Sequence, residues 1–149
     1  MNPLIDIFVP GHPRTKGSLD LVNGMRGRRA APVLADSELS VKWRRLVAYM
    51  ARRAHADLGR EPSLLPIKVE IVACLPADDW PAITRRGAGD VDKLARNVLD
   101  ALAVDPKKPD LAAGVYVDDS QVVDLHIVKL ADLGGAVPRG MRIKVWESV

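Results

Sequence analysis

The sequence predicts a single α/β (α+β) domain, in which helices pack on a mixed β-sheet. Three observations support this fold class. The chain has 149 residues, which suits one domain. A folded domain of this size buries roughly 70% of the surface that its unfolded chain exposes. Strand-like and helix-like segments interleave along it. It contains no internal repeat, no linker and no low-complexity stretch.

Three segments show the alternation of apolar and polar residues that is typical of strands with one face on a core. They are residues 4–9, 66–75 and 141–146, and residues 115–117 and 122–130 are also expected to be extended. The first strand is expected to end at Pro10 and Gly11, and the strand at 122–130 to begin near Asp118 and Asp119.

Two segments have apolar residues at helical spacing. The first is expected to start at Asp36, a favourable N-cap residue, and to end before Gly59. The second starts near Asp90 and carries an apolar stripe that ends at Leu102. Its residues Asp92, Arg96 and Asp100 are spaced by four, so they share the polar face.

Charged loops and faces permit nucleic acid as a partner. The net charge is +3, with 22 basic and 19 acidic residues, which is only mildly basic. Residues 12–32 read as a mobile basic loop, and residues 76–89 as a second loop that contains Trp80, which could stack on an unpaired base. The basic face of the first helix, with Lys42, Arg45, Arg52 and Arg53, fits either a solvated surface or a phosphate-contacting one.

Composition argues against a disulfide scaffold, a zinc site and a membrane segment. The single cysteine, Cys74, lies in an apolar run and is expected to be buried. His12, His55 and His126 lack the spacing of zinc ligands. No apolar stretch approaches the roughly 18 residues that would span a bilayer, so we expect no membrane partner and a cytoplasmic location.

Two acidic clusters, Asp90 with Asp92 and Asp118 with Asp119, lie at opposite ends of a helix, a loop and the start of a strand. If the strand runs beside the helix, these carboxylates converge. Hard cations such as Mg²⁺ and Mn²⁺ prefer oxygen ligands, and a phosphodiester would complete such a site. Taken singly, Asp90 also fits a helix cap, and Asp118-Asp119-Ser120 fits a turn.

A cation near these carboxylates could offset charge on a phosphorane-like transition state, and Arg96 or Lys129 could fill that role. Taken alone, Arg96 also fits a simpler role, an ion pair with Asp92 four residues earlier on the same helix.

Several spaced motifs resemble the RusA family of Holliday junction resolvases. The main run extends from Gly89 through Asp90-Val91-Asp92-Lys93-Leu94 to the Leu99-Asp100-Ala101-Leu102 end of the helix. It is followed by Asp118-Asp119-Ser120-Gln121-Val122 and then Lys129. The opening stretch, residues 9–18, is similar to the first strand of the family and its Pro/Lys-rich loop.

The resemblance implies a homodimeric endodeoxyribonuclease that uses Mg²⁺ or Mn²⁺ to cut four-way junction DNA symmetrically, as recombination and repair require in phage or bacterial cells. It matches Asp90, Asp92 and Asp119 to the essential aspartates of the family, with Asp118 as an additional ligand. Arg96 joins the catalytic set. The expected DNA contacts are Lys16, Arg26, Arg28, Arg29, Arg85, Arg86, Lys93 and Lys129.

Two features depart from the family pattern. Lys93 stands where the family often has Asn, and Arg96 stands where it often has Lys. An arginine keeps the charge but not a titratable proton. The loop at residues 104–114 is also long. These departures motivate an alternative, a catalytically decayed junction-binding protein, and a small metal-dependent phosphohydrolase is a third hypothesis.

Overall fold

The structure, a computed structural model, describes residues 2–16, 38–85 and 88–148. Its strands are β1 (Ile5–Pro10), β2 (Ile67–Leu75), β3 (Val122–Ala131) and β4 (Gly140–Glu147). Its helices are α2 (Glu38–Ala56) and α3 (Val91–Leu102), and the short 3₁₀ turns are η1 (Trp80–Thr84), η2 (Pro109–Leu111) and η3 (Asp119–Gln121).

The four strands form one mixed sheet in the order β1-β4-β2-β3. Strand β4 pairs antiparallel with both β1 and β2, whereas β3 pairs parallel with β2. A parallel pair needs a long crossover connection, and here α3 provides it. The predicted fold class, an α/β domain with a mixed sheet, is confirmed.

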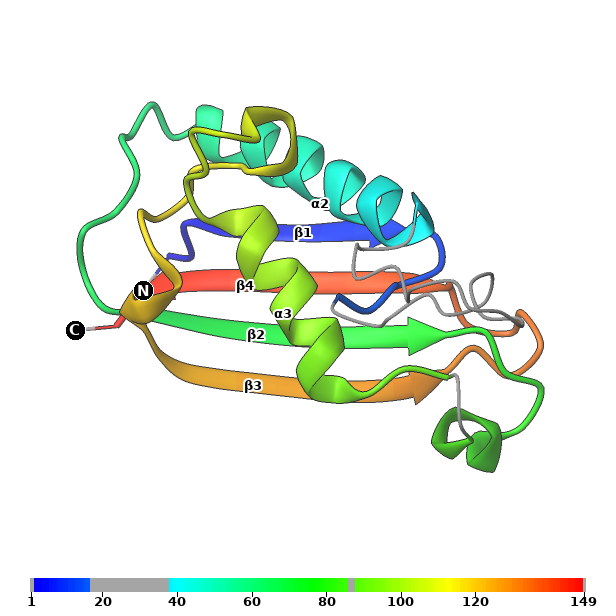
Figure 1. The fold of residues 1–149 in the computed structure, drawn as a ribbon. Helices are drawn as coiled ribbons and strands as arrows, with labels where there is room; N and C mark the ends of the chain where they lie inside the picture. Colours follow the sequence, from blue (N-terminus) through cyan, green and yellow to red (C-terminus); the bar gives the residue numbers. More distant parts are fainter. Residues whose placement is uncertain (1, 17–37, 86–87, 149) are drawn as a thin grey trace.

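Both helices pack on the same face of the sheet (Figure 1). That face presents fully buried residues from neighbouring strands, such as Val69, Ile71, Ile143 and Val145. The opposite face carries charged side chains instead, including an ion pair between Lys68 and Glu70. The alternation seen in the sequence therefore divides the sheet into a helix-covered face and an open face.

Several predicted boundaries shift. Asp36 lies outside the described residues, and α2 ends at Ala56, three residues before Gly59, which has φ +61°. Residues 115–117 do not form a strand with a neighbour, although Tyr116 makes isolated bridges to Ser63 and Ala103. The prediction that Asp118 and Asp119 begin a strand is wrong: they form η3, and β3 begins at Val122.

The basic face of α2 is neither simply a solvated surface nor a free phosphate-contacting surface, because some of its arginines bind other parts of the chain. Arg52 donates to the carbonyls of Pro109 and Ala112 at 2.9 Å each, and Arg45 pairs with Asp110 at 3.2 Å. These contacts fasten the long 104–114 segment to α2.

Cys74 is buried, as predicted. Within the described residues, no helix has the length and apolar character needed to cross a membrane.

One buried amide joins the two helices to the segment that follows β1. Asn97, which is 1% exposed, donates to the carbonyl of Arg14 at 3.2 Å and to the hydroxyl of Ser40 at 3.2 Å. The Ser40 hydroxyl in turn donates to the Thr15 carbonyl at 2.6 Å. Residues 14–16 are therefore held against α3, which determines where Lys16 lies.

We expect Asn97→Ala to lower the free energy of unfolding by about 2 kcal/mol, because it removes the buried hydrogen bonds that this amide donates to the Arg14 carbonyl and the Ser40 hydroxyl. Urea unfolding followed by circular dichroism would measure this loss. Arg45→Ala, which breaks an exposed ion pair, should cost less than about 0.5 kcal/mol. Equal losses in the two variants would contradict the proposed tethering role.

Candidate active site

The first acidic cluster lies at the N-terminus of α3. Asp90 is the N-cap residue, but its side chain makes no capping hydrogen bond and instead lies 3.7 Å from Lys93. Asp92 is exposed in the first turn. The positive end of the helix dipole stabilises both charges there, so the helix offers two ionised carboxylates to solvent.

The second acidic cluster is fixed by a buried tyrosine. Tyr116 is fully buried, and its hydroxyl donates to the carbonyl of Leu99 at 3.0 Å and to Asp119 Oδ1 at 3.4 Å. These bonds bring the 115–119 segment against the C-terminal half of α3. Burial, followed by the nearby Asp119 charge, raises the pKa of Tyr116, so the phenol remains a donor.

Asp118 has a structural role in this segment. Its side chain accepts a 2.8 Å hydrogen bond from the Ser120 amide, and Gln121 Oε1 accepts from the Asp118 amide at 2.8 Å. This reciprocal capping box starts η3. The bonds from Ser120 hold the pKa of Asp118 below its usual value. The turn that the sequence allowed as an alternative is therefore present.

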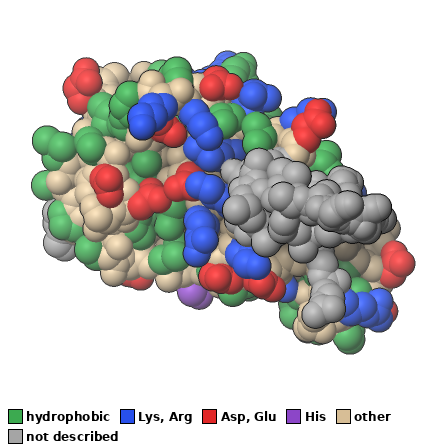
Figure 2. All heavy atoms as spheres, in the orientation of Figure 1, with side chains coloured by type: hydrophobic (Ala, Val, Ile, Leu, Met, Phe, Trp, Pro, Cys, Tyr) green, Lys and Arg blue, Asp and Glu red, His purple; other side chains and the backbone are tan. Residues whose placement is uncertain are grey.

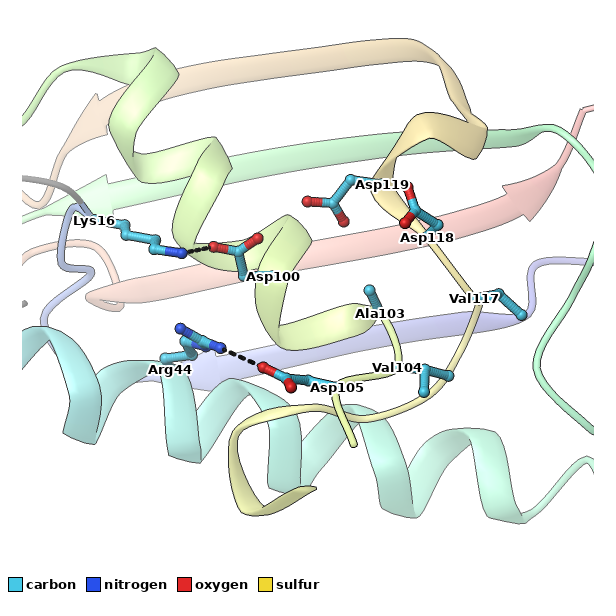
Figure 3. Close-up of a pocket in the computed structure, with 9 residues that line it drawn as sticks. All are labelled: Lys16, Arg44, Asp100, Ala103, Val104, Asp105, Val117, Asp118 and Asp119. Atoms are coloured by element: carbon cyan, nitrogen blue, oxygen red, sulfur yellow. Dashed lines mark hydrogen bonds and ion pairs between the residues drawn. The ribbon is translucent and has the colours of Figure 1, made fainter. Parts of the chain in front are cut away.

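Asp119 points toward Asp100 rather than toward the start of α3 (Figure 3). The two side chains line a pocket of about 270 Å³ together with Lys16, Arg44 and Asp118. Burial, followed by the neighbouring Asp100 and Asp118 carboxyl groups, raises the pKa of Asp119 to about 6. The pair therefore holds a proton in mildly acidic solution.

Lys16 neutralises this pair from the far end of the chain. Its ammonium group forms an ion pair with Asp100, and both side chains are largely buried. Its backbone amide donates to the carbonyl of Lys93 at 3.1 Å. Lys16 was predicted to contact DNA; in the structure it is bound to a carboxylate of the site.

Arg44 supplies a second cation at this pocket. It is 5% exposed, with one guanidinium nitrogen 3.7 Å from Asp105 and another donating to the Leu111 carbonyl at 3.3 Å. A guanidinium that is buried this deeply stays charged, so it contributes a fixed positive field beside Asp100 and Asp119.

A second hollow, a groove of about 430 Å³, lies between α3 and β3. Asp92, Arg96 and Asp119 line it together with apolar residues of both elements. Asp119 therefore borders the groove on one side and the pocket on the other. Asp92 and Arg96 are exposed, and neither has an ion pair within the described part of the chain.

The four predicted metal-ligating aspartates do not form one cluster in the single chain. Among the described residues, no group of three or more His, Cys, Asp or Glu side chains lies close enough to hold a metal ion. Asp92 and Asp119 share the groove, whereas Asp118 shares the pocket with Asp119 and Asp90 lines neither. The expected convergence is therefore partial.

Lys129 reaches the start of α3 from β3. Its ammonium group donates to the Gly89 carbonyl at 2.7 Å. Gly89 has φ +113°, and a Cβ there would lie 3.3 Å from the Thr15 side chain, so the position favours glycine. Lys129 therefore fixes the backbone next to Asp90.

The structure describes only some of the other residues that were predicted to contact DNA. Arg26, Arg28, Arg29 and Arg86 lie outside the described residues. Arg85 is exposed and lies 3.7 Å from Asp79. Figure 2 shows Lys and Arg side chains gathered in a band over the two helices, with acidic side chains beside it. Trp80 is 54% exposed in η1, and its stacking role stays a prediction.

The site residues that the sequence prediction missed are Asp100 and Tyr116. Asp100 was placed on the polar face of α3 with Asp92 and Arg96, and that shared spacing was the available signal. Its partner Lys16 lies 84 positions away, so no local pattern could have paired the two. Tyr116 lies inside the short extended piece at 115–117, where nothing in the local pattern marks it as a site residue.

The fold and the site together define an α/β protein with a carboxylate-bordered groove beside a band of basic side chains. The family model described as endodeoxyribonuclease RusA matches residues 10–145, nearly the whole chain. The chain therefore belongs to the RusA endodeoxyribonuclease family, and the resemblance seen in the sequence is confirmed. This membership implies an endodeoxyribonuclease that acts on Holliday junctions. No curated protein sequence matches the chain.

We expect the Asp119 carboxyl to titrate near pH 6 when its carbon resonance is followed by NMR without divalent cations. Asp100→Asn should lower this pKa, because it removes a negative charge and supplies an amide donor. Burial, the largest cause, remains, so the pKa should stay above that of an exposed aspartate. Asp110→Asn, at an exposed pair, is the control. A wild-type midpoint near 4 would contradict the assignment.

Asp119→Asn should stabilise the protein at neutral pH. The pKa of Asp119 rises from 3.8 to about 6 on folding, so the folded state binds the extra proton between these values and stability falls as the pH rises through this window. The cost is fully present above about pH 6. The variant should gain roughly 1 kcal/mol at pH 7.5, after discounting for partial exposure, and little at pH 4. Urea unfolding in EDTA at both pH values tests this, and an equal gain at both would refute it.

Proposed function

We propose that this chain is a divalent-cation-dependent resolvase that cuts four-way DNA junctions by paired symmetric cleavage of phosphodiesters. The observation that carries the proposal is the position of Asp119. It borders both the groove with Asp92 and Arg96 and the pocket with Asp100 and Lys16. Family membership supplies the substrate class.

The carboxylates suit a hard cation. Asp119 and Asp100 line the same pocket, and the neighbouring negative charges raise the pKa of Asp119, so a divalent cation bound there could offset the repulsion. Mg²⁺ commonly binds through one or two carboxylates, with water and substrate phosphate completing its shell, so a smaller cluster than the predicted four is sufficient. Asp119 and Asp92 are the proposed ligands, with Asp90 and Asp118 as further candidates. When bound, Mg²⁺ or Mn²⁺ would acidify a water molecule and offset phosphate charge.

The cationic side chains would act on the substrate and on the site in different ways. Arg96 is exposed on the groove and has no ion pair within the described residues, so it is available to steady negative charge on the scissile phosphate. An arginine cannot serve as a proton donor. Lys129 and Lys16 would position the α3 backbone and Asp100, respectively.

The basic band supports binding to DNA backbones. Lys93 and Arg85 are proposed phosphate contacts, as are Arg26, Arg28, Arg29 and Arg86. Such contacts are independent of sequence and weaken with salt. Because a four-way junction has two-fold symmetry, paired cuts suit two identical subunits, and we propose a homodimer as the acting form.

We expect Asp92→Asn to reduce cleavage of a mobile four-way junction by at least roughly a hundredfold, because it removes a proposed cation ligand at the groove. Junction affinity should stay within a few-fold or increase, because a negative charge near the phosphates is lost. The measurement uses end-labelled junction and linear duplex with Mg²⁺, Mn²⁺ or EDTA, and gel-shift titration gives the affinity.

Asp110→Asn, an exposed acid at the Arg45 pair, serves as the control and should cleave normally. Tight binding by wild type with no cleavage in any metal would favour the decayed junction-binding protein. Turnover of free nucleotides with no action on junctions would favour a phosphohydrolase. Loss of binding in Asp92→Asn together with cleavage would count against the assigned role.

A further inference from the structure

A hollow of about 240 Å³ lies between the segment that follows β1 and the first turns of α2. The segment after β1 contributes His12 and Arg14 to it. Four residues of α2 that share one face of the helix line the other side, and they are Leu39, Lys42, Trp43 and Leu46. We call it the Arg14–Lys42 hollow. None of its lining residues lines either hollow of the candidate active site.

The charged side chains around this hollow are cationic. Arg14 and Lys42 line it, and no aspartate or glutamate does among the described residues. Arg14 is partly buried and forms no ion pair with another described residue. Lys42 lies 3.6 Å from Glu38, but both side chains are largely exposed, and a surface pair of this kind contributes little. Both cations are therefore available to an anion.

His12 reports the positive field inside the hollow. Burial lowers the pKa of its imidazole, and the charges of Arg14 and Arg139 lower it further. The carboxylate of Asp132 acts in the opposite direction and has the smallest effect. The ring is therefore uncharged at neutral pH and can donate one hydrogen bond. A bound anion would oppose the two arginines and raise the pKa of His12.

The floor of the hollow is apolar. Trp43 is 5% exposed, and Gly11 packs on its ring so closely that an added Cβ would lie 3.3 Å from Trp43 Cζ3. Leu39 on the rim is 52% exposed. A free phosphate ion gains nothing from such a surface. A DNA strand alternates charged phosphates with deoxyribose rings that have apolar faces, so the combination of cations and apolar surface favours a sugar-phosphate backbone.

The segment that carries Arg14 also reaches the acidic pocket of the candidate active site. The Arg14 carbonyl accepts from Asn97 at 3.2 Å, and the Lys16 amide donates to the Lys93 carbonyl at 3.1 Å. The Lys16 side chain extends to Asp100 in that pocket (Figure 3). The Cα atoms of Arg14 and Lys16 are at most about 7 Å apart. A hollow that attracts anions and a pocket that attracts cations therefore adjoin the same short, fastened segment.

We propose that the Arg14–Lys42 hollow binds a backbone phosphate of the DNA substrate that flanks the scissile phosphate, with the neighbouring deoxyribose against Leu39. This inference rests on the proposed function, because cleavage of DNA supplies the scissile phosphate. Each DNA strand carries a phosphate about every 3.4 Å along the helix axis, so a strand that crosses residues 14–16 presents phosphates to both sites. The contact would position the strand without reading its sequence.

Neutralising either cation provides the test. Wild type, Arg14→Gln and Lys42→Gln are each titrated with labelled four-way junction in EDTA, so that binding is measured without cleavage. Each variant should bind at least roughly fivefold more weakly, and the slope of log K against log salt should become shallower by about one. Arg14→Lys, which keeps the charge, should recover most of the affinity.

Lys144→Gln is the matched control. It removes the same charge from the open face of the sheet, where Lys144 neighbours Glu70, and its affinity and salt slope should equal those of wild type. Because Asn97 binds the Arg14 backbone carbonyl, Arg14→Gln keeps this tether and should remain folded, which circular dichroism checks. An equal loss of affinity in Lys144→Gln would overturn the site, because the effect would then follow net charge alone.

The NMR resonance of the His12 ring, assigned with His12→Gln, locates the bound anion. A thymidylate hexamer in EDTA should shift this resonance saturably and raise the pKa of His12 in wild type, and should do neither in Arg14→Gln. An equal shift by inorganic phosphate at the same concentration would indicate a site for the free ion. An equal shift by hexaglutamate would indicate a site for an acidic peptide. Either result would overturn the assignment to a DNA backbone.

The binding titration separates this inference from the function on which it rests. Wild type, Arg14→Gln and Lys42→Gln that bind the junction equally well would overturn the Arg14–Lys42 hollow as a DNA site and leave the proposed function standing. A wild-type protein that binds neither junction nor duplex DNA would overturn both.

Discussion

The burial of Tyr116 is the interaction on which the rest of the site depends. Its side chain is fully buried, its backbone bridges to Ser63 and Ala103, and its hydroxyl donates to the Leu99 carbonyl at 3.0 Å. A buried phenol needs such a partner, so the chain on either side of Tyr116 is held against the helix. Asp118 and Asp119 follow directly, which is why a turn on the surface carries a carboxyl group that is half withdrawn from water.

That withdrawal shapes the electrostatics of the site. Asp119 is partly desolvated and lies beside Asp100 and Asp118, all of the same charge. The protein offsets this repulsion with cations from distant segments, Lys16 from the loop after β1 and Arg44 from α2. Groups arranged in this way commonly mark functional sites. The opposite arrangement holds at the start of α3, where Asp92 stays exposed and the helix dipole favours its charge.

The sheet order connects the site to the outer surface of the molecule. Because the chain crosses through α3 into a parallel strand, β3 becomes an edge, and the carboxylates that precede it lie next to that edge. The groove between α3 and β3 is thus bordered by acids at its rim and by apolar side chains along its wall. Acidic and apolar surface are therefore combined in one groove.

The sequence alone determined the local elements, since the apolar periods of β1, β2, α2 and α3 directly reflect which faces are buried. It also determined the family, because several motifs in fixed order are more specific than any single one. Only the tertiary structure decided which carboxylates meet. Asp100 and Lys16 pair over 84 positions, and a capping box turned Asp118 inward to its own backbone. Long-range pairs and caps of this kind depend on how the elements pack, and residue spacing carries no record of that packing.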